Sequence, residues 1–216
     1  EEVSNQGKSP VLIADTEGLR GLLAFGDTIR PDAYQVISRL KALGKQVIML
    51  TGDHENTANA ISKRLGISHA VAGISPSDKA NAIKGLQENG YLTAMVGDGI
   101  NDAPSLTQAD VGIALGTGTD IAIESAEITL IKGDLNGILQ TLQLSKLTLR
   151  TIRQNLFWAF AYNIVLIPVA AGVLYPFFGV LLTPALAAAA MAFSSVFVVT
   201  NALRLKRFSR TEEIYS

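Results

Sequence analysis

The strongest constraint on the fold is a short acidic loop that follows an apolar run near the middle of the chain. The run Thr93–Val96 predicts a buried strand, and it ends at Gly97-Asp98-Gly99, with Asp102 and Pro104 just beyond. Open α/β sheets place ligand groups at the carboxyl ends of their strands, and glycine lets the backbone turn sharply there. Because Mg²⁺ prefers carboxylate oxygens, the loop predicts a magnesium site. The alternative is structural, with Asp102 as a helix N-cap and Asp98 as a turn residue.

Strands and helices alternate on both sides of this loop. Short apolar runs predict strands over Gln46–Leu50, His69–Ala72, Thr93–Val96, Val111–Leu115 and Ile128–Ile131. Apolar residues at helical spacing, together with capping residues, predict helices over Asp32–Leu43, His54–Leu65, Ser75–Glu88 and Thr119–Ser125. This alternation is typical of βαβ units and predicts an α/β domain with a parallel sheet.

The residues before this domain follow a different pattern. Pro10–Ala14 and Leu19–Phe25 are apolar runs separated by Asp15–Gly18, which predicts a β-hairpin with a glycine-containing loop. Gly26–Pro31 then breaks the pattern and predicts a linker or hinge.

The chain also contains a segment that is nearly free of charge. Hydrophobic residues make up 48% of the chain and mean hydropathy is +0.30, but the excess is concentrated after Leu156. Leu156–Leu174 and Val180–Leu203 are each long enough to cross a bilayer, which takes ~20 helical residues. Their short connection, Tyr175–Gly179, predicts an antiparallel transmembrane hairpin, preceded by a helix that begins at Leu135. A buried helical hairpin of a soluble protein is the alternative.

Basic residues lie at both outer ends of this hairpin. They are Lys146, Arg150 and Arg153 before it, and Arg204, Lys206, Arg207 and Arg210 after it. Because cytoplasmic flanks carry the excess of Lys and Arg, we expect an integral membrane protein with both ends and the α/β domain in the cytoplasm. The net charge of −1 gives no support for a nucleic-acid partner, and the absence of cysteine excludes disulfides and thiolate metal sites.

Two further strand ends carry polar groups that suit a phosphoryl ligand. Thr51-Gly52-Asp53 follows one strand, where a hydroxyl and backbone N–H groups at a helix start suit an anion. Lys79 lies in the first turn of its helix, where the macrodipole disfavours a cation, so a bound phosphate would explain its position. With the acidic loop, these groups predict a site that acts by positioning and charge neutralisation. The alternatives are a capping Thr51 and a solvated Lys79.

The motifs TGD, PSDK and GDGINDAP, in that order, resemble the phosphorylation domain of P-type ATPases, in the haloacid dehalogenase superfamily. The resemblance implies a parallel-sheet, Rossmann-like α/β domain followed by an all-α transmembrane helical hairpin. It also implies that Thr51 and Lys79 contact an aspartyl phosphate. By the same resemblance, Asp98 binds Mg²⁺ with Asp102, and the remaining motif residues of the site are Gly52, Asp53 and Asn101.

One element of the family is missing from this sequence. The nucleophile is the aspartate of a DKTGT motif, and the nearest string, Asp15-Thr16-Glu17, lacks the lysine and the glycine. We therefore expect the nucleophile strand upstream of residue 1, and expect this chain alone to be inactive. The resemblance divides the chain into the end of a nucleotide-binding domain (1–25), a phosphorylation domain without its nucleophile strand (26–145), the last two transmembrane helices (146–208) and a tail (209–216).

Polar residues within the two spans indicate the transported ion. Met191, Ser194 and Ser195 are spaced to lie on one helical face, and the other span carries Tyr162 and Asn163. Neither span contains Asp, Glu, Lys or His, and a thioether favours a soft ion such as Cu(I). Packing by the methionine and back-bonding by the serines are the alternatives. The set resembles the last two spans of copper-type P-type ATPases, whose transport site also uses a Cys-Pro-Cys on an earlier span.

The sequence is therefore interpreted as the C-terminal part of a Cu(I)-exporting P-type ATPase. The interpretation implies Mg²⁺, ATP bound mainly by the missing domain, and Cu⁺ as the transported ion. The expected partners are the missing N-terminal remainder, membrane lipid and the copper ion, with a soluble copper chaperone as a further candidate. A silver- or zinc-type pump, a catalytically inactive membrane-anchored fragment and a membrane-tethered phosphatase are the alternatives.

Overall fold

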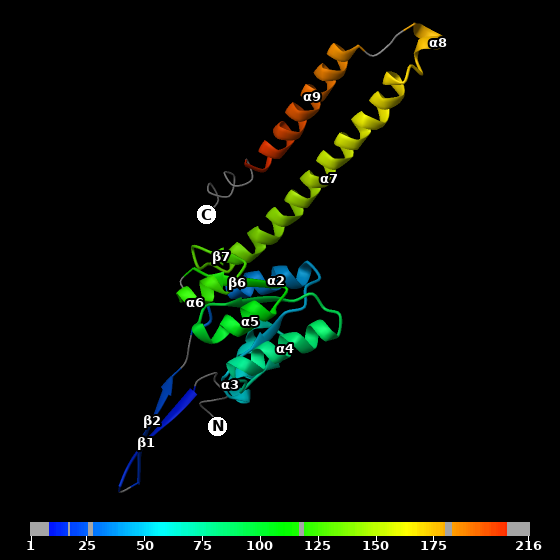
Figure 1. The fold of residues 1–216 in the computed structure, drawn as a ribbon. Coiled ribbons are helices and arrows are strands. Elements are labelled where there is room, and N and C mark those ends of the chain that lie inside the picture. The colour runs from blue at the N-terminus through cyan, green and yellow to red at the C-terminus, as the bar shows by residue number, and fades with distance from the viewer. Residues whose placement is uncertain (1–8, 17, 26–27, 117–118, 180–182, 207–216) are drawn as a thin grey trace. The chain divides into compact units, whose positions relative to one another are not determined.

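The computed structural model describes residues 9–16, 18–25, 28–116, 119–179 and 183–206. The chain forms two compact units, Glu1–Gln140 and Thr141–Ser216 (Figure 1). Several predicted features lie outside the described residues, in whole or in part: the hinge Gly26–Pro31, the start of the second span at Val180, the basic residues Arg207 and Arg210, and the tail 209–216.

The first unit begins with the predicted β-hairpin. Strands β1 (Ser9–Asp15) and β2 (Gly18–Phe25) pair antiparallel, and Arg20 Nε donates to Asp15 Oδ2 at 2.6 Å near the turn. Apolar side chains are exposed along both strands, among them Leu12 and Leu19. The hairpin therefore does not bury its own hydrophobic residues.

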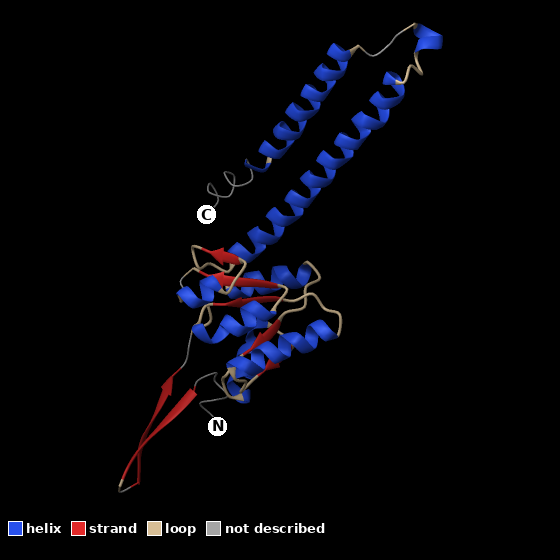
Figure 2. Cartoon of the chain, viewed as in Figure 1, coloured by secondary structure: helices blue, strands red, loops and turns tan. Residues whose placement is uncertain are grey.

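The α/β part contains all five predicted strands, and all of their pairings are parallel (Figure 2). Strand β3 (Ile48–Leu50) pairs with β4 (His69–Val71), and β5 (Ala94–Gly97), β6 (Val111–Leu115) and β7 (Ile128–Leu130) form a second group. The sequence predicted one sheet, whereas the structure has two. Among the described strands, β3 pairs only with β4 and β5 only with β6, so each leaves one edge unpaired.

The helices also follow the sequence pattern. They are α2 (Ala33–Ala42), α3 (Glu55–Leu65), α4 (Pro76–Glu88), the 3₁₀ turn η1 (Ile100–Asp102), α5 (Ala103–Gln108) and α6 (Asp120–Glu124). Ser75 caps α4 by accepting a hydrogen bond from the Asp78 amide at 3.2 Å, ahead of a proline at the first helical position. Gly66 ends α3 with φ at 68°, a conformation that favours glycine.

The core of this unit joins the second strand group to two helices. Val36 of α2, Ile113 of β6 and Ile138, near the start of α7 (Asn136–Ala170), are buried together. Asp32 fixes the same junction, because its carboxylate accepts the Leu135 amide at 2.8 Å. Burial acts to raise the pKa of Asp32, but the hydrogen bond from the Leu135 amide and the charge of Arg30 act in the opposite direction, and the pKa is lowered.

The second unit contains the rest of α7, the short helix α8 (Tyr175–Phe178) and α9 (Pro184–Leu203). The first predicted span was to end at Leu174, but α7 ends at Ala170, and the connection contains a helical turn. Within the described residues, no helix combines the length and the apolar character needed to cross a membrane. The predicted pair of transmembrane spans is therefore not supported by these helices.

Candidate functional site

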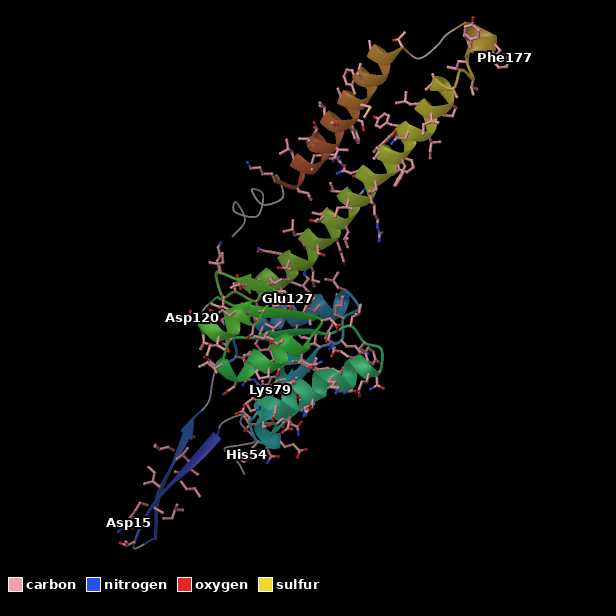
Figure 3. All side chains as sticks on the ribbon, viewed as in Figure 1. Asp15, His54, Lys79, Asp120, Glu127 and Phe177 are labelled. Atoms are coloured by element: carbon pink, nitrogen blue, oxygen red, sulfur yellow. The ribbon has the colours of Figure 1, made fainter. Side chains whose placement is uncertain are left out.

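The acidic loop is organised around Asp102. Lys79 lies on α4 (Figure 3), and its Nζ donates to Asp102 Oδ1 at 2.9 Å. The side chains are 16% and 14% exposed, so the pair is largely shielded from water. The Gly99 amide lies 3.4 Å from the other carboxylate oxygen of Asp102. Asp102 therefore links the first turn of α4 to the loop after β5.

Gly97 is required by the close approach of this carboxylate. A Cβ at this position would lie 2.7 Å from Asp102 Cβ and 2.9 Å from Asp102 Oδ2. These separations are well below the ~3.5–4.0 Å at which carbon atoms pack. The glycine in the motif therefore lets the strand end pass directly against the Asp102 side chain.

The loop after β3 is held by its own threonine and aspartate. Thr51 Oγ1 donates to Asp53 Oδ2 at 2.9 Å and accepts the Asp53 amide at 3.1 Å. The amides of Gly73 and Ile74 donate to the Asp53 and Thr51 carbonyls at 2.8 and 3.2 Å. The loop after β3 is thus tied to the loop after β4, which leads into the helix that carries Lys79.

Asp98 has the most accessible carboxylate of the loop. Its side chain is exposed, while its carbonyl accepts the Thr119 amide at 3.0 Å and so contacts the start of α6. In the part of the chain that the structure describes, no third Asp, Glu, His or Cys joins Asp98 and Asp102 as a metal-binding group. Mg²⁺ uses one or two carboxylates together with substrate phosphate, so Asp98 fits such an ion. Asp102 is already engaged by Lys79.

The contacts of Asp102, Lys79 and Thr51 bear on the structural alternatives for these residues. Asp102 does occupy the N-cap position of α5, as its structural alternative required, but its side chain makes no capping hydrogen bond to that helix and instead accepts from Lys79 and the Gly99 amide. Lys79 is largely shielded from water and is paired with Asp102, so the alternative of a solvated lysine is wrong. Thr51 does accept a local amide, as its capping alternative required. Asn101 is exposed, and its predicted role stays a prediction.

One contribution was missed by the sequence reasoning. The sequence predicted a helix over Thr119–Ser125, and Thr119 Oγ1 caps this helix by accepting the Ala122 amide at 3.3 Å. Its backbone also contacts Asp98, as described above. Residues 117–118 lie outside the described residues. The signal was available, because this segment follows a strand at the same edge of the sheet.

In the second unit, two contacts set the register of α7 against α9. The Asn201 amide group donates to Asn155 Oδ1 at 2.8 Å and to Gln154 Oε1 at 3.4 Å. The rings of Trp158 and Phe197 meet edge to face at 5.6 Å. Higher residue numbers on α7 therefore pair with lower residue numbers on α9, which means that the two helices run antiparallel. The polar cluster at Asn201, which is buried, was not anticipated from the sequence.

The predicted ion ligands extend from this register. One helical turn beyond the contact of Trp158 with Phe197, Tyr162 of α7 lies level with the turn of α9 that contains Ser194. Asn163 Nδ2 donates to the Ala159 carbonyl at 2.9 Å and Ser195 Oγ to the Met191 carbonyl at 3.2 Å, each within its own helix. The serine therefore makes the back-bond that was the structural alternative. Met191 is 70% exposed.

Comparison with known proteins shows the family of the chain. Residues 1–110 match the family model described as haloacid dehalogenase-like hydrolase. The chain therefore belongs to the haloacid dehalogenase-like hydrolases. This assignment agrees with the α/β fold and its parallel strand pairings.

Relatives indicate the branch of the family. The chain is 60% identical over 197 residues to "Probable copper-transporting ATPase PacS" of Synechocystis sp., covering 91% of this chain and 26% of that protein. It is 57% identical to "Copper-transporting ATPase 1" of Rhizobium meliloti, covering 95% and 25%. A crystal structure of a zinc-transporting PIB-type ATPase in the E2.Pi state matches with a TM-score of 0.80 and 38% identity, covering 94% of this chain and 32% of that one.

These similarities confirm the resemblance to heavy-metal P-type ATPases that the motifs indicated. The chain spans about a quarter of the length of the copper-transporting relatives.

Proposed function

We propose that this chain is the C-terminal part of an ATP-driven Cu(I) export pump, in which aspartyl-phosphate chemistry is coupled to ion transport. The observation that carries the proposal is the pairing of Lys79 with Asp102 beside the exposed carboxylate of Asp98. A cation and two carboxylates at the ends of parallel strands are the components of a phosphoryl-transfer site. The identity of 60% to a probable copper-transporting ATPase supports the same proposal.

In this proposal each loop residue has a separate role. Asp98 holds Mg²⁺, which when bound neutralises charge on the phosphoryl group. Lys79 contacts a phosphoryl oxygen, and Asp102 fixes the position of the Lys79 ammonium group. Thr51 presents its hydroxyl from the loop Thr51-Gly52-Asp53, whose shape is held by the hydrogen bond between Thr51 and Asp53, and Asn101 completes the acidic loop.

The two sheets support the proposal that the nucleophile strand lies outside this sequence. Among the described strands, β3 and β5 each have one unpaired edge. A parallel strand that paired with both would join the two groups into one sheet and satisfy the free backbone groups. Its carboxyl end would lie between the Thr51 loop and the Asp98 loop, where an acceptor aspartate is needed. In this division, residues 1–25 belong to the nucleotide-binding domain, which binds ATP.

The second unit is proposed to belong to the membrane region of the pump, as an integral membrane segment with both ends on the cytoplasmic side. Large apolar side chains are exposed along α7 and α9, including Ile164 at 70% and Phe193 at 74%. Surfaces of this kind are normally covered by lipid or by neighbouring helices. The proposed Cu(I) ligands from these helices are Tyr162, Asn163, Met191, Ser194 and Ser195. The remainder of the pump and a copper chaperone are its proposed partners.

A silver pump is the second candidate. The chain is 50% identical to "Silver exporting P-type ATPase" of Salmonella typhimurium, covering 93% of this chain. Cu(I) and Ag(I) are both soft monovalent ions that favour thioether ligands, so transport assays with each ion are needed to separate them.

The site assignment is tested in the complete protein by replacing Asp98 with Asn. We expect Mg²⁺-dependent, hydroxylamine-sensitive phosphorylation by ATP to fall on the order of 10²-fold, because the charge that holds the metal is lost. Asp120→Asn is a matched control, since that carboxylate is also exposed and begins the neighbouring helix α6. Unchanged phosphorylation in Asp98→Asn would contradict the site. If this chain became phosphorylated without the upstream part, the proposal that the acceptor aspartate lies outside this sequence would be refuted.

The ion assignment is tested by Met191→Leu. Leucine retains the apolar volume but removes the sulfur, so we expect Cu(I)-stimulated ATP hydrolysis and transport to weaken. Phe193→Leu is the control, because it alters an exposed apolar residue on the same helix without removing a metal ligand. Equal transport by the wild type and Met191→Leu would refute the thioether ligand.

A further inference from the structure

A hollow of ≈ 400 Å³ lies against α7 within the second unit. Its lining includes Lys146, Arg150, Arg153, Phe157 and Trp158. These residues recur at helical spacing, so they lie along one face of α7. The hollow is therefore basic over its first two turns and aromatic at the end where the apolar half of the helix begins.

The three cations of the hollow lack a protein counter-ion within the described part of the chain. No carboxylate there lies within ion-pair distance of Lys146, Arg150 or Arg153, and all three side chains are exposed. Like charges three or four residues apart on a helix repel each other. A bound anion would relieve this repulsion, and arginine in particular presents planar donors that match the oxygens of a phosphate.

The aromatic end of the hollow resembles a membrane interface. Phe157 is 65% exposed, and Trp158 stacks against Tyr162 of the same helix as well as contacting Phe197 of α9. Beyond them α7 exposes apolar side chains such as Ile164. Trp and other aromatic residues gather where lipid headgroups meet acyl chains, and basic residues lie on the headgroup side.

We propose that this hollow binds the phosphate headgroup of an anionic membrane lipid, with Lys146, Arg150 and Arg153 as its ligands and Trp158 against the upper acyl chain. The proposal rests on the proposed membrane placement of the second unit. The chemistry of the lining favours a lipid over a free phosphate or an acidic protein, because the aromatic pair leads directly into exposed apolar surface. Basic pockets on the cytoplasmic side of membrane helices bind anionic headgroups in this way.

Trp158 makes the proposal directly testable, because it is the only tryptophan of the chain. The full chain is reconstituted in phosphatidylcholine vesicles that contain a minor share of either brominated phosphatidylglycerol or brominated phosphatidylcholine. Bromine quenches tryptophan emission on contact, so the two quenching curves compare an anionic with a zwitterionic lipid at the same site. We expect phosphatidylglycerol to be preferred on the order of tenfold at low salt, and less at high salt.

Two variants distinguish a specific headgroup site in the hollow from nonspecific attraction between basic residues and anionic lipid. K146Q/R150Q/R153Q should lose the preference for phosphatidylglycerol while phosphatidylcholine still quenches Trp158. R204Q/K206Q removes basic residues near the end of α9 that do not line the hollow, and it should keep the preference. If the wild type shows equal quenching by both lipids, or if both variants lose the preference together, the headgroup site is refuted while membrane placement stands. If neither lipid quenches Trp158, the membrane placement is refuted with it.

Discussion

The contact between Gly97 and Asp102 gives a prediction with a worked magnitude. In Gly97→Ala the new Cβ would lie 2.7 Å from Asp102 Cβ, 2.9 Å from Oδ2 and 3.0 Å from Cγ. Because Cβ is fixed to the backbone, a side-chain rotation of Asp102 cannot relieve the overlap, and η1 must shift. Overpacking of this kind costs about 1–3 kcal/mol. Displacing Asp102 from Lys79 adds about 1 kcal/mol for a charged hydrogen bond that retains some exposure.

The expected loss of local stability is therefore about 2–4 kcal/mol. Trp158 lies in the second unit, so its fluorescence does not report on this site. Amide hydrogen exchange of β5, η1 and the first turn of α4 is the appropriate measurement, since it gives opening free energies segment by segment. We expect exchange in these segments to accelerate in Gly97→Ala, with little change in the β-hairpin.

Gly99→Ala is the matched control, two residues away in the same loop. Its Cβ would meet nothing closer than 3.8 Å, and its φ of −104° is accessible to alanine. We expect stability to be unchanged or to rise by up to about 1 kcal/mol, through the reduced entropy of the unfolded chain. If Gly97→Ala exchanged like the wild type, or if both variants lost protection equally, the close approach of Asp102 would not be the reason for glycine at position 97.

Two further predictions concern the junctions of each unit. The pKa of Asp32 is lower in the folded than in the unfolded state, so its carboxylate stabilises the fold above the unfolded-state pKa of about 3.9. This stabilisation is lost as the pH falls through the folded-state pKa. Amides around Leu135 should therefore lose protection from hydrogen exchange on acidification in the wild type, and less so in Asp32→Asn. Asn201→Leu should weaken the α7–α9 contact by about 1 kcal/mol and shift Trp158 emission, whereas Thr200→Ala, whose hydroxyl bonds only its own helix, should not.

The local structure of the α/β domain follows closely from its sequence because the signals are local. Ser75 followed by Pro76 marks the start of α4, and Gly66 with its positive φ marks the end of α3, where the sequence predicted them. Strand pairing, in contrast, depends on segments that are far apart in the sequence. A single sheet was predicted from the alternation of strands and helices, but two strands join one sheet only when they pair with each other or with a shared neighbouring strand. The edges of β3 and β5 lack a shared neighbour in the described chain, and no local pattern reports this.

The contact at Asn201 illustrates a second limit of sequence reasoning. The side chain of an asparagine near a helix end can bond its own helix or a neighbouring one, and the sequence around Asn201 does not decide between the two. Its contacts with Asn155 and Gln154 depend on how α7 and α9 pack, which the helical period alone does not specify. The same holds for the Asp32 contact to Leu135, which joins residues far apart in sequence.

Lys79 connects these two kinds of inference. A cation in the first turn of a helix is disfavoured by the macrodipole, so the sequence favours a nearby anion over a solvated lysine. It cannot indicate which anion, because the position of Asp102 beside α4 is set by the path of the chain through β5 and η1. The structure supplies a carboxylate where a phosphate was expected. The two need not compete, because Asp102 neutralises Lys79 and holds its ammonium group in place, while two further donors of that group remain for a phosphoryl oxygen.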